Sequence, residues 1–576
     1  MTNLAKVTPS AATPAAKETK AQKAERLKLE KNPWEAWDEV RQFAREGRAA
    51  VLPEWTEFYF KWWGIYTQGD GVGVTGGKDG QGNASEFFMM RIGLPNGLLT
   101  SHQLRVIGEL TQKYARNLAD ITTRQNIQLH WLTIEALPEI VDALTAVGLS
   151  PKGMCGDVVR NVTGCPLAGL DAHELVDASP LAVEIAHRLT ANPEFYNLPR
   201  KFKVTVSGCP VWCSYPEIND VALTAIRRGD EVGYTLRVGG GLSTEPHIAV
   251  RIPVFIPQTK AVEVVEAVLR IFKEQTELRE NRTRARLKYL FLRHGWTAES
   301  MLAAIEEKLG YKLDPLPVSE DETPDDVYRD HIGVTPQRQA ALSAVGASVL
   351  RGRLTGDQLI QLADLAEEFG DGHLRATIMQ NIIVANIPNA RTRDVVERLN
   401  QIGLQVEVSP FWRGAIACTG TEFCKLAIAE TKGFAKWLVG EMEERLPAFD
   451  QQIKLHVTGC TNSCGQSWIA DIGLEGKKIK KDGAMVDAFY FCVGGAVGKY
   501  AGIARQIGFR AAAEDCPAAI ERLLRAYLAA RAPGEDLRAY FARTDDETLR
   551  EQLAGTAVTP VERDPPPVGG RHIVDA

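Results

Sequence analysis

The chain has 576 residues, of which 45% are hydrophobic, so it is long enough for three or four domains with separate cores. A formal net charge of −6 argues against general affinity for nucleic acid, and no run approaches the 18 apolar residues that a membrane-spanning helix needs. Ten cysteines are too few for a disulfide scaffold in a chain of this length. We therefore expect a cytoplasmic, reducing compartment, where cysteine clusters indicate metal or redox chemistry.

The N-terminal part contains no recognisable catalytic motif. Residues 1–30 are rich in Ala, Lys and Thr without the apolar stretch of a secretory signal, which predicts a disordered tail running into a charged helix. Residues 31–84 form an N-terminal extension that ends in the glycine-rich run GDGVGVTGGKDGQGN (69–83). Because this run lacks a strand-to-helix context, it favours a flexible loop over a dinucleotide site. We expect no flavin or NADPH domain.

The chain contains a long internal repeat. Residues 99–149 align with 354–404 at a constant offset of 255, which pairs Thr100 with Thr355 and Gln125 with Gln380. Further on, VTVSGC (204–209) aligns with LHVTGC (455–460) at an offset of 251. Repeats of this length predict a duplicated pair of modules rather than a solenoid.

Each repeat has the pattern of an α+β module. A segment with helical apolar spacing precedes a strand or hairpin at 119–135, and a second helix ends at Gly148. This order suits a ferredoxin-like layer. We therefore predict a pseudo-twofold α+β fold with half-domains at 85–150 and 331–410 and larger domains at 151–330 and 411–550. An acidic, Pro-rich linker (312–330) joins the halves, and residues 551–576 are predicted to be a disordered tail.

Four cysteines in the second repeat have the spacing of a metal centre. Cys418 and Cys424 form a C-x5-C pair, and Cys460 and Cys464 form a C-x3-C pair 35 residues later. Four thiolates complete the ligand set of a [4Fe–4S] cluster or of a tetrahedral zinc ion. C-x5-C is wide for zinc, and small polar residues around the cysteines leave backbone N–H groups for cluster sulfide, so the pattern favours iron. A structural zinc site is the alternative.

The stretches ACTGTEFCKLAIAETK (417–432) and GCTNSCGQ (459–466) resemble the sirohaem-containing nitrite and sulfite reductases. The resemblance covers nearly all of the chain after about residue 55. It implies that the four cysteines hold one [4Fe–4S] cluster and that Cys464 bridges the cluster to the sirohaem iron. The implied activity is the six-electron reduction of nitrite to ammonia, or of sulfite to sulfide, by a monomer that receives electrons from ferredoxin.

The resemblance also implies an anion pocket and a sirohaem-binding strand. Four basic residues would form the catalytic pocket around the substrate: Arg91, Arg160, Lys201 and Lys203. ITTRQNIQLHW (121–131) resembles the family's sirohaem-binding strand, and its candidate contacts are Arg124, Gln128 and His130. Their even spacing predicts that they share one face of a strand, toward the carboxylates of sirohaem. The family often has Arg in place of His130. Asn462 is a further candidate for contact with sirohaem.

The first repeat keeps cysteines at three cluster-equivalent positions, which are Cys165, Cys209 and Cys213. Cys155 lies four residues before the position that matches Cys418. A second cluster is one interpretation. The other is a degenerate copy whose cysteines pack as small hydrophobes, and the family pattern has only one cluster.

The choice between substrates depends on a few motifs. VRNVTGCPLAG and EINDVAL resemble ferredoxin–nitrite reductases, whereas Lys203 stands where those enzymes commonly carry Asn and sulfite reductases keep Lys. We predict nitrite, with sulfite as the alternative.

A non-catalytic iron–sulfur scaffold and a cobalamin-pathway oxygenase are the hypotheses from other classes, and the four basic pocket residues together argue against the oxygenase. Two basic runs, 279–293 and 477–481, are candidate docking surfaces for an acidic ferredoxin.

Overall fold

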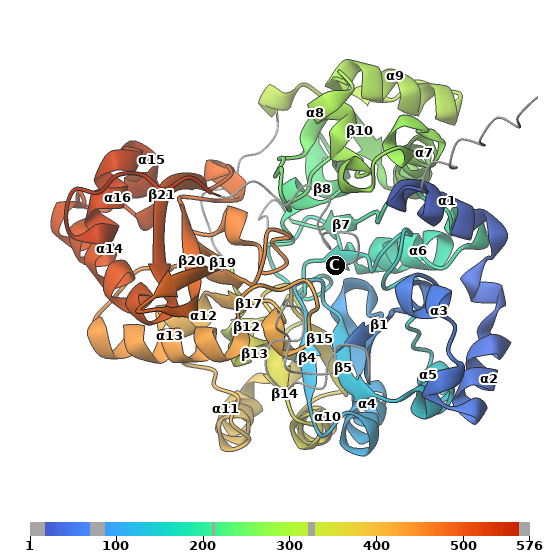
Figure 1. The fold of residues 1–576 in the computed structure, drawn as a ribbon, viewed down its shortest axis with the longest axis horizontal. Coiled ribbons are helices and arrows are strands. Elements are labelled where there is room, and N and C mark those ends of the chain that lie inside the picture. The colour runs from blue at the N-terminus through green and yellow to red at the C-terminus, as the bar shows by residue number, and fades with distance from the viewer. Residues whose placement is uncertain (1–17, 69–86, 210–212, 321–328, 564–576) are drawn as a thin grey trace, which may run out of the picture.

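A computed structural model describes residues 18–68, 87–209, 213–320 and 329–563 (Figure 1). The glycine-rich run at 69–83 lies outside the described residues, as do the two ends of the chain. In the described part, no helix combines the length and the apolar character needed to cross a bilayer.

The N-terminal extension is helical and packs against the first half-domain. It contains α1 (Lys20–Glu30), α2 (Trp37–Glu46) and α3 (Pro53–Glu57). Thr19 begins α1 with a capping box, because its hydroxyl accepts from the N–H of Gln22 while the Gln22 side chain accepts from the N–H of Thr19. The charged helix expected at the end of the N-terminal tail is confirmed as α1, whereas the predicted end of the disordered tail at residue 30 is wrong, because the helix begins at Lys20. Trp55 and Trp62 are fully buried in the core beneath these helices.

Two five-stranded sheets form the ferredoxin-like half-domains. The first has the order β1 (Ile65–Gln68), β2 (Phe87–Ile92), β5 (Ile127–Leu132), β4 (Ala119–Ile121) and β14 (Arg353–Leu354). The second has the order β12 (Gly333–Pro336), β13 (Leu342–Ala347), β16 (Ile382–Pro388), β15 (His373–Ala376) and β3 (Leu98–Thr100). Each sheet thus takes its last strand from the other repeat. The four half-domain helices are α4 (Ser101–Tyr114), α5 (Leu137–Ala146), α10 (Gly356–Phe369) and α11 (Thr392–Gln401).

Contacts between the half-domains are reciprocal. The Gln125 amide donates to the carbonyl of Ala376, and its repeat counterpart Gln380 donates to the carbonyl of Ile121, both at 3.0 Å. Gly97 has a φ of +70°, and a Cβ there would lie 2.1 Å from the Ala376 carbonyl oxygen. Gln125 and Gln380, which occupy equivalent positions in the two repeats, therefore each bind the opposite half and hold the two halves together about the pseudo-twofold axis.

The two larger domains each contain one mixed sheet. The first sheet has the order β11 (Asp314–Pro315), β10 (Val250–Pro257), β9 (Glu231–Val238), β8 (Val221–Arg228), β7 (Val204–Ser207) and β6 (Thr163–Gly164). The second has the order β17 (Ala415–Ala417), β18 (Leu455–Thr458), β19 (Ile472–Lys481), β20 (Ala484–Val493) and β21 (Arg505–Ala512). In both sheets the three strands nearest the cysteines, β6–β7–β8 and β17–β18–β19, are parallel.

Helices cover these two sheets on separate sides of the molecule (Figure 1). Those of the first domain are α6 (Ser179–Leu189), α7 (Ala261–Glu274), α8 (Lys288–Arg293) and α9 (Ala298–Leu309). Those of the second are α12 (Pro410–Arg413), α13 (Lys432–Arg445), α14 (Cys516–Ala530), α15 (Leu537–Arg543) and α16 (Asp546–Ala554). The predicted α+β fold with pseudo-twofold symmetry is confirmed.

The C-terminal segment and the linker differ from their predictions. Helix α16 continues to Ala554, Val561 donates its N–H to the Gly508 carbonyl at 2.8 Å, and Arg563 pairs with Glu475 at 2.7 Å. Disorder from residue 551 is therefore wrong up to 563. In the predicted linker, β11 pairs with β10 and so extends the first large sheet. The other domain boundaries stay predictions.

One buried carboxylate joins three distant segments. The Asp157 side chain is 1% exposed and accepts from Lys28 of α1 at 3.0 Å, from Arg200 at 3.1 Å and from Arg282. Burial alone would raise the pKa of Asp157, but these three cations lower it well below its usual range. Asp157 therefore stays ionised and holds α1 against the first large domain.

Asp157→Asn should lower the free energy of unfolding by about 3–5 kcal/mol, because the change leaves three cations without their shared counter-charge. The pKa of Asp157 is depressed, so its contribution is complete above about pH 4 and is lost as the pH falls through the folded-state pKa. Urea unfolding of the holoenzyme at several pH values measures both effects. The control is Asp142→Asn, whose exposed ion pair with Arg41 should contribute less than about 1 kcal/mol. Equal losses in the two variants would contradict this role.

Candidate active site

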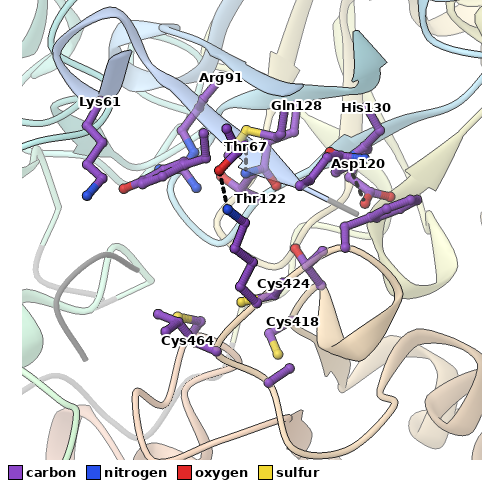
Figure 2. Close-up of a pocket in the computed structure, with 18 of the residues that line it drawn as sticks. Lys61, Thr67, Arg91, Asp120, Thr122, Gln128, His130, Cys418, Cys424 and Cys464 are labelled. Atoms are coloured by element: carbon purple, nitrogen blue, oxygen red, sulfur yellow. Dashed lines mark hydrogen bonds and ion pairs between the residues drawn. The ribbon is translucent and has the colours of Figure 1, made fainter. Parts of the chain in front are cut away.

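A cavity of about 900 Å³ separates the first half-domain from the cysteine loops of the second large domain. Figure 2 shows Arg91, Gln128 and His130 descending from the strands on one side, and Cys418, Cys424 and Cys464 on the loops opposite. The two halves also touch here, because the Thr123 hydroxyl donates to the Cys464 carbonyl at 3.3 Å. Neither half alone would enclose this space.

The four predicted cluster cysteines come together at one edge of this cavity. Cys418 follows β17 and Cys460 follows β18, so two neighbouring parallel strands deliver both pairs at the same end of the sheet. The pKa of Cys460 is raised well above its usual value by burial and by the nearby Cys424, Cys464 and Cys418. Backbone N–H groups point at the sulfurs as expected, and Gly459 donates to Cys418 Sγ at 3.2 Å.

The spacing of these sulfurs fits a cluster better than a single zinc ion. Zinc–thiolate bonds of about 2.3 Å in a tetrahedron place the sulfurs about 3.8 Å apart. Among the described residues, the only group of three ligand atoms within 4.8 Å of one another lies elsewhere. The four sulfurs are spread more widely, as thiolates bound to different irons are. Cys464 is also exposed and lines the cavity, so its sulfur is accessible to a second group.

Arg91 and Arg160 meet at one backbone carbonyl. Nη1 of each donates to the Met154 carbonyl at 3.2 Å. Arg91 also donates to Cys155 Sγ at 3.1 Å, and with the Gln128 amide oxygen facing it, Nη2 donates to that oxygen at 2.8 Å. Burial would lower the pKa of Arg91, but nearby groups, Cys155 first among them, raise it. Arg91 lines the cavity itself, whereas Arg160 lies behind it.

Lys201 and Lys203 extend this positive region. They flank Phe202, which is fully buried and whose carbonyl accepts from the Arg160 N–H at 2.9 Å. The pKa of Lys201 lies well below its usual value because of burial and because of Lys203 and other cations. The pKa of Lys203 is lowered by burial and by Arg124 and Arg286, while Asp220 and Cys464 oppose that shift. The structure therefore groups all four predicted catalytic residues.

The predicted sirohaem-binding strand is only partly as expected. Gln128 and His130 line the cavity from β5, but Arg124 lies in the turn before it, where Gln125 has a φ of +57°. This turn breaks the even spacing, and Arg124 instead donates to the Asn161 carbonyl at 2.6 Å and to the Asn219 side chain at 2.9 Å. The predicted shared face is therefore wrong for Arg124.

His130 and Asn462 also have protein partners. The ring nitrogens of His130 lie 3.0 Å from Gln68 Oε1 and 3.1 Å from Asp120 Oδ2, and its ring stacks on Phe423. Both ring nitrogens of His130 therefore already have hydrogen-bond partners in the protein, although the residue lines the cavity. Asn462 donates to Cys460 Sγ at 3.6 Å.

Sequence reasoning missed several lysines. Five of them line the cavity: Lys20, Lys23, Lys61, Lys425 and Lys432. Lys425 directly follows Cys424, and its ammonium donates to the Thr67 hydroxyl, so its place in the CKLA motif was a usable signal. Lys20 and Lys23 lie on α1, and nothing in the sequence connects that helix with this site.

The first basic run is partly buried, and Arg284 and Arg293 are its exposed members, so its role in docking stays a prediction. Arg282, Arg286 and Lys288 are buried, and the first two pair with Asp157 and Asp220. These residues support the pocket from behind. In the second run, Lys478 pairs with Asp487, which also accepts from the Glu430 N–H at 3.0 Å, next to the cluster loops.

Comparisons with known proteins agree with this geometry. A family model described as the nitrite and sulphite reductase 4Fe-4S domain matches residues 155–313 and 410–559, and one described as the nitrite/sulfite reductase ferredoxin-like half domain matches 79–147 and 335–402. The assimilatory ferredoxin-dependent nitrite reductase of Haloferax mediterranei is 36% identical over 548 residues, which cover 89% of this chain and 90% of the relative. Sulfite reductase [ferredoxin] 1 of Mycolicibacterium paratuberculosis is 36% identical over 541 residues, 91% of this chain and 95% of the relative.

A solved structure has the same fold. The structure of the Mycobacterium tuberculosis NirA protein matches with a TM-score of 0.86 and 34% identity, over 92% of this chain and 97% of that one. The matches extend over both repeats and over the cysteine loops. The chain therefore belongs to the nitrite and sulfite reductase family, oxidoreductases that carry a sirohaem and a [4Fe–4S] cluster.

Proposed function

We propose that this chain reduces nitrite to ammonia with electrons from a reduced ferredoxin. The observation that carries the proposal is the meeting of two features in one place. Cys464, the accessible cluster cysteine, lies near Arg91, which lines the same cavity, and near Lys203, with Arg160 and Lys201 grouped behind them. A small oxyanion that is to accept electrons needs both features within contact distance.

The cofactors fit the residues present. Cys418, Cys424, Cys460 and Cys464 would hold the cluster, and Cys464 would connect it to the sirohaem. The eight carboxylates of sirohaem would find cations and amides around the cavity, and these are Lys20, Lys23, Lys61, Gln128 and Lys425. When bound, the two groups supply single electrons to the anion, one after another.

The protein contributes charge, orientation and protons. Arg91 lines the cavity and would orient a planar oxyanion, while Arg160, which shares the Met154 carbonyl with it, would support Arg91 and add positive charge from behind. Burial and neighbouring cations lower the pKa values of Lys201 and Lys203, so each ammonium would be a stronger proton donor than an exposed lysine. The departing oxygens of the substrate would receive these protons.

Several sequence motifs resemble those of nitrite reductases and so support nitrite as the substrate, whereas Lys203 supports sulfite. VRNVTGCPLAG and EINDVAL favour nitrite, and one of the relatives above is named a nitrite reductase. Lys203 favours sulfite, because an additional cation suits an anion that can carry two charges, and a sulfite reductase is equally similar. The deciding experiment is a comparison of kcat/KM for the two anions with reduced ferredoxin.

A docking site for ferredoxin is supported near Lys477 and Lys478. Gly476 packs against Gly459, which directly precedes Cys460, so the start of this lysine run lies beside the cluster loops. Lys481 is farther along β19 and pairs with Glu514 and Asp515. An acidic carrier would approach the cluster over the first two lysines.

Cys464→Ser should abolish six-electron turnover, because serine is a poor ligand for soft metals and cannot bridge the two cofactors. Activity with nitrite and sulfite, together with the sirohaem absorption bands, provides the measurement. Cys516→Ser is the matched control, since Cys516 is a fully buried thiol in α14, apart from the site. Full activity in Cys464→Ser would sink the bridge assignment.

Lys203→Asn should raise the ratio of kcat/KM for nitrite over sulfite by about tenfold, or about 1.4 kcal/mol in transition-state stabilisation. Removing one positive charge costs an anion with two charges roughly twice as much Coulomb energy. Arg160→Ala should impair both reactions and so serves as the comparison. An unchanged ratio with both activities intact would show that Lys203 does not act on the substrate.

A further inference from the structure

Two cysteines of the first repeat lie close to one histidine. The ligand atoms of Cys165, Cys213 and His331 all lie within 4.8 Å of one another, and Cys165 Sγ is 4.0 Å from His331 Nε2. A tetrahedral zinc ion with bonds of about 2.3 Å to sulfur and 2.0–2.1 Å to nitrogen places its ligand atoms about 3.6–3.8 Å apart. The three ligand atoms would need to approach one another by at most about 1 Å to reach that spacing.

Cys209 lies next to this group, although its sulfur is not within 4.8 Å of all three ligand atoms. Hydrogen bonding with Cys209 and with Cys213 raises the pKa of the Cys165 thiol, which places the Cys209 thiol beside Cys165. Cys209 is 2% exposed, and its sulfur lies 3.8 Å from the Ser207 hydroxyl. Three sulfurs and one imidazole nitrogen make a complete ligand set of the kind found at structural zinc sites.

The backbone around His331 is built to hold the ring in place. His331 has a φ of +61°, a conformation that β-carbon-bearing residues rarely adopt. Gly346 makes room for it, since a Cβ there would lie 1.7 Å from the His331 carbonyl oxygen. The neighbouring Asp330 accepts two hydrogen bonds from Arg413 at 2.6 and 2.7 Å, which fixes the segment to the second half.

Cys165 and Cys213 lie in apolar surroundings, and the ligands for a second iron–sulfur cluster are incomplete there. Leu167, Leu170, Ala344 and Ile383 pack around Cys165 and Cys213. The fourth thiol that a second iron–sulfur cluster would need is absent, because Cys155 lies beside Arg91 instead. The close spacing also differs from that of the cluster cysteines in the second repeat, which are not gathered within 4.8 Å.

We propose that Cys165, Cys209, Cys213 and His331 bind one Zn²⁺ ion at the position in the first repeat that corresponds to the iron–sulfur cluster of the second. All four ligands come from the protein, so the ion has no open position and acts as a structural bond between the first large domain and the segment that leads into the second half. The proposal does not depend on which anion the enzyme reduces.

Elemental analysis of the holoenzyme tests the site. We expect one zinc per chain in addition to about five irons, four from the cluster and one from the sirohaem. Cys165→Ser should lose the zinc and keep the iron, labile sulfide and sirohaem bands. Cys516→Ser, the buried-thiol control, should keep the zinc.

X-ray absorption at the zinc edge identifies the ligands. The holoenzyme should show three sulfur ligands and one nitrogen ligand, and His331→Ala should lose the nitrogen. This readout separates the site from zinc that replaces the iron–sulfur cluster, which would show four sulfurs. If Cys165→Ser does not fold, His331→Ala alone provides the test.

Three results would overturn the proposal. The first is an iron-replete enzyme that contains no zinc after incubation with zinc chloride and desalting. The second is equal zinc in Cys165→Ser and in the control. The third is a disulfide between two of the three cysteines, detected by mass spectrometry of the unreduced enzyme.

Discussion

The structure depends on a concentration of positive charge that the protein itself only partly neutralises. Arg91, Arg124, Arg160, Lys201 and Lys203 lie close together, and burial, with Arg160 and other cations, lowers the pKa of Arg124 to about 9. Buried charges are costly unless they are paired. Asp220 accepts from the Lys203 N–H and pairs with Arg286, which supports this region from behind. The front of the region is left for anions, the substrate and the carboxylates of a cofactor.

Gene duplication supplied the framework, and the two copies then diverged. Asp220 accepts from the Lys203 N–H at 2.8 Å, and its counterpart Asp471 accepts from the Lys454 N–H at 2.6 Å. The backbone of the cysteine loops is therefore held in the same way in both copies. The side chains differ: the second copy presents its thiols to the cavity, while the first presents cations to the cavity and keeps its thiols in an apolar pocket.

Local signals predicted local features well. The cysteine spacing and the helical apolar spacing of the repeat each depend on neighbouring residues, and the structure shows the expected helices and loops, with the repeat counterparts Thr100 and Thr355 capping α4 and α10. Strand periodicity failed at Arg124, because a single left-handed residue at Gln125 turns the chain before β5 begins. The burial of Arg282, Arg286 and Lys288 within the basic run at 279–293 was not predicted, for another reason. Charge along a sequence does not reveal burial, and the partners Asp157 and Asp220 are more than 60 positions away. Lys28 of α1 was missed for the same reason.

The exchange of edge strands between the half-domains has a consequence for biosynthesis. Strand β3 is synthesised early but pairs with β15. The Gln125 amide likewise has its hydrogen-bond acceptor, the Ala376 carbonyl, 251 positions later in the chain. Contacts of such long range close slowly, and a sheet edge without its partner is prone to pair wrongly. A ribosome-bound first half would thus present an incomplete sheet until much of the second half has emerged. The cavity between the halves forms only at that point, so cofactor loading must follow synthesis of nearly the entire chain.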